Sequence, residues 1–260
     1  MGNKKPLILI TNDDGYLAKG IIALIDSVKG LGEILVVAPD GPRSGMSSAI
    51  TSLHPLRVHL ETEEPDLKIY SCTGTPVDCV KLGINELAER KPDIVLSGVN
   101  HGSNAAVAVL YSGTMGAALE GAVFKVPAIG FSLLDHSHDA DFSYSKKYIR
   151  LLTQQVIEEG LPAGTCLNVN IPKGNAINGI KVCRQTSGQW IKEFFLSKDG
   201  AHKNVYWLTG EFANDEPHDE ATDEWALAHN YISVVPVKVD MTHHEHIKKM
   251  KNWEVLSDSI

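Results

Sequence analysis

Residues 7–15 of the chain read LILITNDDG, an apolar run that ends in an asparagine, two aspartates and a glycine. An unbroken apolar run bounded by turn residues predicts a strand that is buried on both faces, as in a parallel sheet. Open α/β sheets bind ligands at the carboxyl ends of such strands, and this end carries Asp13 and Asp14. Two ionised carboxylates at close range repel each other, so we expect a cation or a shared proton there. The alternative is an Asp-Gly turn whose carboxylates lie in water.

Strands and helices alternate from this stretch to about residue 171. Apolar residues at helical spacing predict a helix over 20–28, and the run EILVVAP predicts a second buried strand over 33–39, so this segment forms a βαβ unit. The alternation is typical of a doubly wound α/β fold with a parallel sheet. The remaining elements expected are a hairpin within 50–72, strands over 93–97, 126–134 and 166–171, and helices over 75–90, 115–124 and 146–159.

The loops after the second and third long strands bring more oxygen donors to the edge that holds the two aspartates. Ser44 lies in the loop after 33–39, and its hydroxyl suits a hard cation beside carboxylates. The loop GVNHGSN that begins at Gly98 contains Asn100 and Asn104. An asparagine offers a neutral oxygen to a metal and an NH₂ group to a phosphate. The alternative is that turn chemistry alone explains these Ser, Gly and Asn residues.

The sequence YSGT at 111–114 directly precedes a predicted helix. Ser112, Gly113 and Thr114 therefore stand at a helix N-terminus, where free backbone N–H groups and the helix dipole form an anion site. Simple N-capping by Ser112 or Thr114 is the alternative, and the two interpretations are compatible. A site that holds its cation through oxygen atoms alone favours Mg²⁺ or Mn²⁺, with Ca²⁺ as a further candidate.

Composition limits the classes of partner. A net charge of −8 with no basic block excludes duplex nucleic acid as a main partner. No apolar run approaches the length of a membrane span and the N-terminus lacks a signal-peptide pattern, so we expect a cytoplasmic protein without a membrane partner. The 4 cysteines have no metal-ligand spacing, which is typical of reduced core thiols in a cytosolic protein.

Residues 186–212 depart from the alternating pattern. Segments 189–196 and 205–212 predict the two strands of a hairpin with a charged tip near 198–200. A lone hairpin is marginal in water, and its aromatic residues need cover, so we expect a second subunit to pack against it. Beyond it, residues 222–228 predict a capped helical turn and 231–239 a late strand. The aromatic residues of the hairpin are Trp190, Phe194, Phe195, Tyr206 and Trp207.

The order of the motifs resembles that of the stationary-phase survival protein SurE family over about residues 7–242; they are ITNDDG, APD, RSG, GTPVDCV, SGVNHGSN, YSGT and TDEWALAHNYISVVP. Members of that family are metal-dependent nucleoside monophosphate phosphatases. The resemblance implies a Rossmann-like sheet, a C-terminal arm and late strand used in oligomerisation, and a homodimer or homotetramer. It implies a single domain over 1–260, with a core over about 1–185, an arm over about 186–212 and an exchange segment over about 213–260.

The resemblance also implies one divalent cation per subunit. The family's metal ligands carry over to Asp13, Asp14, Ser44 and Asn100, and its phosphate-side positions carry over to Asn104, Ser112, Gly113 and Thr114. The sequence departs from the family's motifs at two places, and neither is a predicted metal ligand. Ala105 and Ala106 stand where many members have glycine soon after the second asparagine, and Asn230 replaces the glycine usual before Tyr-Ile-Ser.

We therefore expect a divalent-metal-dependent 5′-nucleotidase that hydrolyses nucleoside 5′-monophosphates, and also 3′-monophosphates, to nucleoside and phosphate. Asp13 and Asp14 are the expected catalytic residues, and either an Asp attacks the phosphorus or an Asp and the metal position a water. The alternative is a non-hydrolytic nucleotide-binding regulatory module. An aspartyl-phosphate phosphatase needs two aspartates one residue apart after the strand, so the adjacency of Asp13 and Asp14 counts against it.

Overall fold

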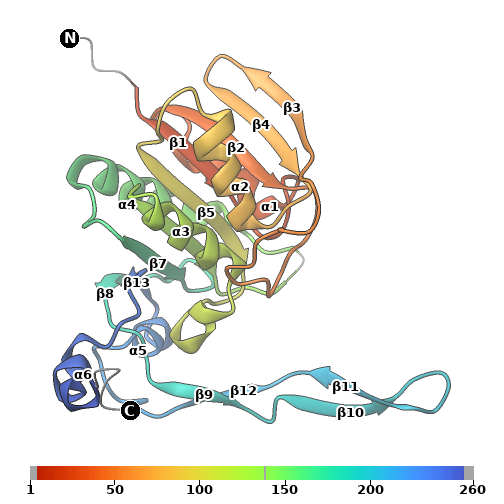
Figure 1. The fold of residues 1–260 in the computed structure, drawn as a ribbon, viewed down its shortest axis with the longest axis vertical. Coiled ribbons are helices and arrows are strands. Elements are labelled where there is room, and N and C mark those ends of the chain that lie inside the picture. Colours follow the sequence, from red (N-terminus) through yellow and green to blue (C-terminus); the bar gives the residue numbers. More distant parts are fainter. Residues whose placement is uncertain (1–4, 138, 255–260) are drawn as a thin grey trace.

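The computed structural model describes residues 5–137 and 139–254, and in them a large central sheet organises the chain (Figure 1). Within the described residues this sheet has 9 strands in the order β3-β4-β2-β1-β5-β6-β7-β13-β8. It is mostly parallel, because only the β3–β4 and β7–β13 pairs are antiparallel. The strands are β1 (Leu7–Thr11), β2 (Glu33–Pro39), β3 (Val58–Glu64), β4 (Leu67–Cys72), β5 (Ile94–His101), β6 (Ala128–Leu133), β7 (Thr165–Ile171), β8 (Gly179–Val182) and β13 (Tyr231–Lys238).

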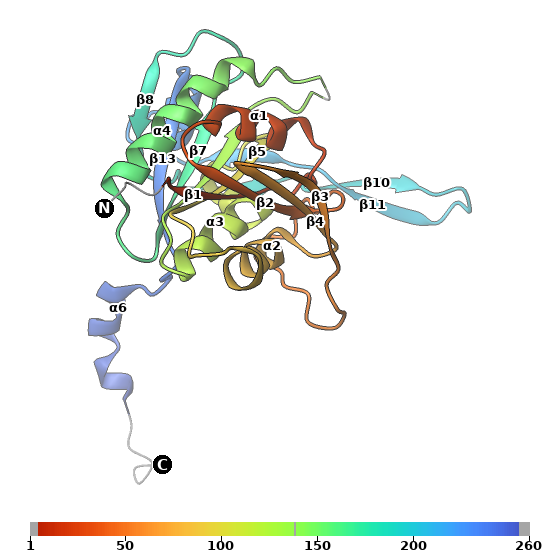
Figure 2. The ribbon, with the colours of Figure 1, turned by 90° about the horizontal axis from the view of Figure 1, so that it is seen from above.

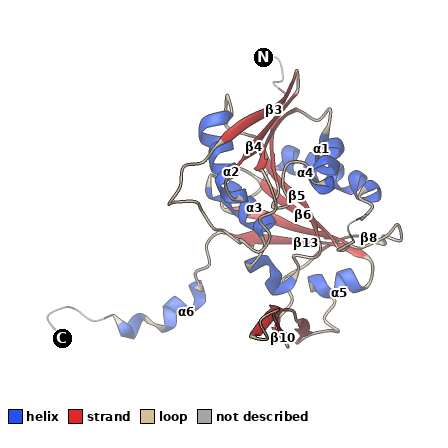
Figure 3. Cartoon of the chain, turned by 90° about the vertical axis from the view of Figure 1, so that its right-hand side faces the viewer, coloured by secondary structure: helices blue, strands red, loops and turns tan. Residues whose placement is uncertain are grey.

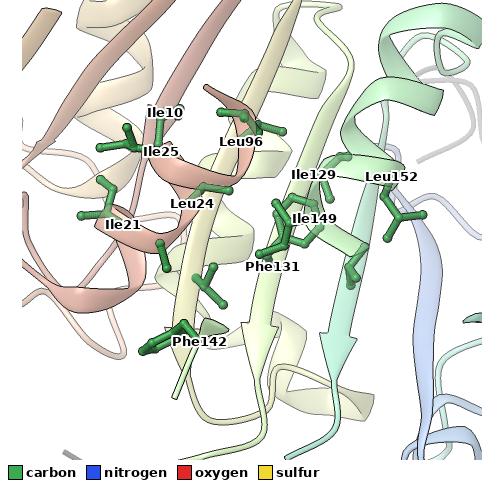
Figure 4. Packing of buried hydrophobic residues seen from close by; sticks show 14 of the residues in the cluster. Ile10, Ile21, Leu24, Ile25, Leu96, Ile129, Phe131, Phe142, Ile149 and Leu152 are labelled. Atoms are coloured by element: carbon green, nitrogen blue, oxygen red, sulfur yellow. The ribbon is translucent and has the colours of Figure 1, made fainter. Parts of the chain in front are cut away.

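Helices cover both faces of the sheet, as the doubly wound pattern predicts (Figure 2). The helices α1 (Lys19–Val28) and α4 (Lys146–Glu159) pack on one face, where Ile21, Ile149 and Phe131 are fully buried (Figure 4). On the other face lie α2 (Pro76–Leu82) and α3 (Gly113–Val123). The Rossmann-like α/β architecture expected from the sequence is therefore confirmed.

The position of β1 sets the position of the site. Each residue of β1 is buried, and the strand pairs in parallel with β2 on one side and β5 on the other. Because parallel strands end at the same edge of a sheet, the segments that follow β1, β2 and β5 meet there.

The helix predicted over 75–90 ends early. Thr75 caps α2 as expected, since its side chain accepts a hydrogen bond from the Asp78 N–H (3.1 Å). The regular helix stops at Leu82, and a π-helix (Gly83–Leu87) follows it. Gly83 lies against β1, where a Cβ atom would stand 2.7 Å from the Cδ1 of Leu9. Close packing on the strand, which the helical pattern does not reveal, accompanies this change of winding.

The predicted hairpin exists, but it is divided into two ladders. Strand β9 (Gly188–Ile191) pairs with β12 (Glu211–Asn214), and β10 (Phe194–Lys198) pairs with β11 (Asn204–Leu208). The break lies at Lys192 and Gly210, which have φ angles of +52° and +140°. The hairpin, which we call the arm, projects away from the sheet (Figures 1 and 2).

The C-terminal part returns to the sheet and then leaves it. After α5 (Asp223–Ala228), β13 enters the sheet between β7 and β8, and α6 (His244–Lys249) lies apart from it (Figure 3). None of the helices described in residues 5–137 and 139–254 is long and apolar enough to cross a membrane.

Candidate active site

The loops after β1 and β2, the segment from the end of β5 to the start of α3, and the arm line a cavity of about 450 Å³ at the carboxyl edge of the sheet. Its volume falls within the range of roughly 300–1,000 Å³ that is usual for small-molecule sites. The cavity brings together most of the side chains predicted from the sequence, although Gly113 and Thr114 are not among its lining residues. The predicted residues that line it are Asp13, Asp14, Ser44, Asn100, Asn104 and Ser112.

A tight turn after β1 presents the two aspartates. The side chain of Asn12 donates to the carbonyl of Gly15 (2.9 Å) and accepts from its N–H (3.2 Å). Gly15 has a φ of +103°, a left-handed conformation that glycine adopts without steric cost. The N–H of Arg43 donates to the carbonyl of Asp13 (2.7 Å), which ties the Ser44 loop to the aspartate turn.

Both aspartates lie in an environment that disfavours their charge. Asp13 is 4% exposed, and burial raises its pKa to about 6, although the Thr114 hydroxyl opposes this shift by donating to Asp13 Oδ1 (2.6 Å). Burial also raises the pKa of Asp14, and the neighbouring His101 opposes it. The Oδ2 atom of Asp14 is buried and has no hydrogen-bond partner among the described residues. A buried carboxylate oxygen without a partner is costly, so this pair is electrostatically incomplete without a cation.

The neutral donors complete an oxygen set that fits a hard divalent cation. The NH₂ group of Asn100 donates to the carbonyls of His101 (3.2 Å) and Gly102 (3.0 Å), which leaves its Oδ1 to bind a metal. Ser44 contributes a hydroxyl from the exposed loop after β2. No group of three or more His, Cys, Asp or Glu in the described ranges could hold a metal, so the two aspartates need such neutral oxygens beside them.

The residues expected on the phosphate side divide into two kinds. Ser112 lines the cavity and caps α3 by accepting from the Met115 N–H (3.0 Å). Thr114 is fully buried and holds Asp13, so its hydroxyl supports the carboxylate rather than facing the cavity. At Gly113 a Cβ atom would lie 2.9 Å from the Cβ of Asp13, so glycine lets the start of α3 approach the aspartate.

Asn104 lines the cavity but is anchored by its neighbours. It is 6% exposed, its NH₂ group donates to Ser132 Oγ (2.7 Å), and its backbone N–H donates to Asn170 Oδ1 (2.8 Å). This network joins the loop after β5 to β6 and β7.

Sequence reasoning missed several side chains that line the cavity. His101 and Tyr111 are adjacent to predicted site residues, and that adjacency could have identified them. Trp190 and Glu193 come from the arm. No sequence signal placed them here, because the direction of the arm relative to the sheet is a tertiary property.

A model of a known protein family matches most of the chain. The family model described as "Survival protein SurE" matches residues 8–192, which is more than half of the chain. The chain belongs to the SurE family. The expectation drawn from the motifs is thereby confirmed.

SurE relatives match nearly the whole chain. A protein of Phocaeicola vulgatus named "5′-nucleotidase SurE" is 51% identical over 255 residues, which cover 98% of this chain and 99% of the relative. A protein of Christiangramia forsetii with the same name is 51% identical over 260 residues and covers 98% of this chain and 99% of the relative. The crystal structure of the SurE protein from Aquifex aeolicus superposes with a TM-score of 0.83 at 38% identity, covering 96% of this chain and 100% of that one.

Two residues that depart from the SurE motifs have backbone angles typical of glycine. Ala106 has a φ of +50° and Asn230 a φ of +58°. Asparagine enters the left-handed region with little strain, whereas alanine pays the clash of its Cβ with the backbone. Neither substitution changes a predicted metal ligand of the SurE site.

Proposed function

We propose that the protein is a divalent-metal-dependent 5′-nucleotidase, a phosphatase that releases phosphate from nucleoside 5′-monophosphates and also from 3′-monophosphates. The observation that carries the proposal is the Asp13–Asp14 pair in an open cavity, with Asp13 buried and the buried Oδ2 atom of Asp14 without a hydrogen-bond partner among the described residues. The SurE relatives named 5′-nucleotidase, about half identical over nearly the whole chain, support the same activity.

Each residue of the cavity has a role in this proposal. Asp13, Asp14, Ser44 and Asn100 hold one cation, Mg²⁺ or Mn²⁺ with Ca²⁺ as a further candidate. When bound, that cation offsets the charge of the phosphate and polarises the phosphorus.

The start of α3 orients the phosphate. Ser112 lines the cavity at the N-terminus of α3, where the helix dipole favours negative charge. Thr114 keeps Asp13 in position through its hydroxyl. Asp13 and Asp14 are the carboxylates that either attack the phosphorus or position the water that does.

Phosphate release by wild type and Asp14→Asn tests the assignment. We expect release from 5′-AMP and 3′-AMP that requires Mn²⁺ or Mg²⁺, and loss of turnover in the variant. Without metal the variant should be at least as stable as wild type, because one like charge has been removed. Saturating Mn²⁺ at 100 times its Kd should stabilise wild type by about 2.7 kcal/mol and the variant far less.

The competing function is a regulatory module that binds nucleotide without hydrolysis. Binding of 5′-AMP by wild type with no phosphate release at any Mn²⁺ concentration would favour that module and overturn the enzymatic assignment. Turnover by Asp14→Asn near the wild-type rate would instead show that the metal lies elsewhere.

We also propose that the arm packs against a second copy of the chain, giving a homodimer or homotetramer in the cytoplasm. Its support is the exposure of Phe194, Phe195, Tyr206 and Trp207, each 62–66% accessible in the single chain. The proposed exchange segment is 213–260, of which residues 255–260 lie outside the described residues.

Light scattering tests this assembly. We expect intact protein to be dimeric or larger at micromolar concentration, and a variant with 189–211 replaced by a short Gly-Ser turn to become monomeric or to aggregate. A stable monomer of the intact protein would show that the arm does not serve assembly.

A further inference from the structure

The root of the arm forms the outer wall of the cavity. Trp190 lies on β9, and Glu193, Leu208 and Thr209 lie at the break between the two ladders of the arm. Hydrogen bonds fix that break, because the Thr209 N–H donates to the carbonyl of Glu193 (2.7 Å) and the Thr209 hydroxyl donates to that of Lys192 (3.1 Å). The hydrogen-bonded break of the arm therefore lines the same cavity as the two aspartates.

A buried carboxylate holds this wall against the loop after β5. Asp223 is 1% exposed, and its Oδ2 accepts from the Ala106 N–H (2.8 Å). Its Oδ1 accepts from the N–H (2.9 Å) and the hydroxyl (2.5 Å) of Thr186, at the start of the arm. Strand β9 consequently packs against the 3₁₀ helix Ala106–Leu110 (Figure 1). The arm root is thus held to the segment that directly follows Asn104.

Trp190 lines the cavity and is packed on its neighbours without being fully covered. Its indole meets the Phe212 ring edge to face, with centroids 5.9 Å apart. It also packs over Gly210, where a Cβ atom would lie 3.1 Å from Cε3 of the indole. The side chain nevertheless remains 37% exposed. A supported but uncovered aromatic face in a cavity is a surface on which a planar ring stacks.

The charges of the cavity orient a nucleotide. A cation held by the metal ligands would attract the phosphate, and the helix dipole at the start of α3 favours negative charge there, whereas the Glu193 carboxylate of the arm repels it. The arm wall therefore faces the uncharged end of the substrate. A carboxylate there accepts hydrogen bonds from ribose hydroxyl groups or from an amino group of the base.

We propose that the arm root is the nucleoside-binding wall of the site, with Trp190 stacking on the base and Glu193 accepting a hydrogen bond from the nucleoside. The inference rests on the proposed phosphatase function and adds the residues that recognise the organic part of the substrate. Asp13 and Asp14 act on the phosphate ester bond that is hydrolysed. Trp190 and Glu193 act on the nucleoside, and they determine which phosphate ester binds.

Two substrates with the same phosphate ester distinguish binding of the base from hydrolysis of the ester. Ribose 5-phosphate has the ester and the sugar of 5′-AMP but no base. Stacking of one base on an aromatic side chain stabilises the bound state by about 1–3 kcal/mol. Loss of that stacking in Trp190→Ala should therefore raise the KM for 5′-AMP roughly 10-fold or more. The kcat for 5′-AMP and both constants for ribose 5-phosphate should stay unchanged. Trp190→Phe, which keeps an aromatic ring, should restore most of the affinity.

Trp253→Ala is the matched control, because Trp253 is 70% exposed and does not line the cavity. It should leave both substrates unaffected. Glu193→Gln should raise the KM for 5′-AMP or for both sugar-containing substrates without lowering kcat. Equilibrium binding of 5′-AMP to the same variants measures the affinity for the nucleotide independently of turnover.

The outcomes distinguish the two proposals. If Trp190→Ala affects 5′-AMP and ribose 5-phosphate equally, or affects neither, the inference is wrong while the phosphatase function stands. If wild type releases no phosphate but Trp190→Ala still weakens 5′-AMP binding, the arm root binds the nucleoside and the phosphatase proposal fails. Wild-type protein that binds no 5′-AMP at all overturns both.

Discussion

Ala106 joins the backbone of the site to the arm, and it does so in a conformation unfavourable for alanine. Its φ is +50°, while the preceding Ala105 has an ordinary φ of −72°. The left-handed conformation costs a residue with a Cβ about 1–2 kcal/mol. The strain is maintained because the Ala106 N–H donates to the buried carboxylate of Asp223.

Ala106→Gly should therefore raise the free energy of unfolding by about 1 kcal/mol, since the relieved strain exceeds the added entropy of the unfolded chain. Ala105→Gly is the matched control and should lower it by a few tenths to about 1 kcal/mol, because it adds only entropy. Denaturant unfolding of both variants measures the difference. Equal destabilisation by the two substitutions would show that residue 106 carries no strain.

At the scale of elements, the regular segments were predictable and their junctions were not. The strand over 33–39 and the helix over 146–159 have the bounds that the sequence predicts, because each rests on a clear apolar period and on flanking turn residues. The end of α2 and the break in the arm depend on packing against Leu9 and on the angles at Lys192 and Gly210, which no periodicity reports.

The close approach of α3 to β1 gives a prediction at this scale. Gly113→Ala places a methyl group 2.9 Å from the Cβ of Asp13, so α3 or the aspartate turn must shift. We expect a loss of stability of about 1–3 kcal/mol and a large fall in turnover. Val123→Ala, at the exposed far end of the same helix, should retain activity. Wild-type turnover in Gly113→Ala would mean that the position of Asp13 tolerates the shift.

At the scale of the whole molecule, the cavity combines segments that sequence analysis could group and segments that it could not. Asp13 and Ser44 follow strand ends, Asn100 lies near the carboxyl end of β5, which runs on to His101 instead of ending at Ser97, and Ser112 caps α3, so topology alone brings them to one edge. Trp190 and Glu193 arrive through the arm, whose root is held by the buried contact between Asp223 and Thr186.

Asp223→Asn tests that contact. One amide oxygen replaces two acceptor oxygens, so an N–H of Ala106 or Thr186 loses its partner at a cost of about 1–3 kcal/mol. Hydrogen exchange at 186–192 should accelerate, and the KM for 5′-AMP should rise. Glu224→Gln is the control, since Glu224 is adjacent but accepts none of these hydrogen bonds. Unchanged exchange at the arm root would show that other contacts hold it.

The division of the cavity between core and arm makes the molecule modular. The groups assigned to metal and phosphate lie between residues 13 and 114, whereas those assigned to the nucleoside lie between residues 190 and 209. The two sets belong to separate supersecondary units that meet at the cavity and at the Asp223 contact. Substrate range can therefore diversify by variation in the arm while the hydrolytic machinery stays constant. A chimera that carries the arm of a relative on this core should inherit the base preference of the arm's donor and the metal dependence of the core.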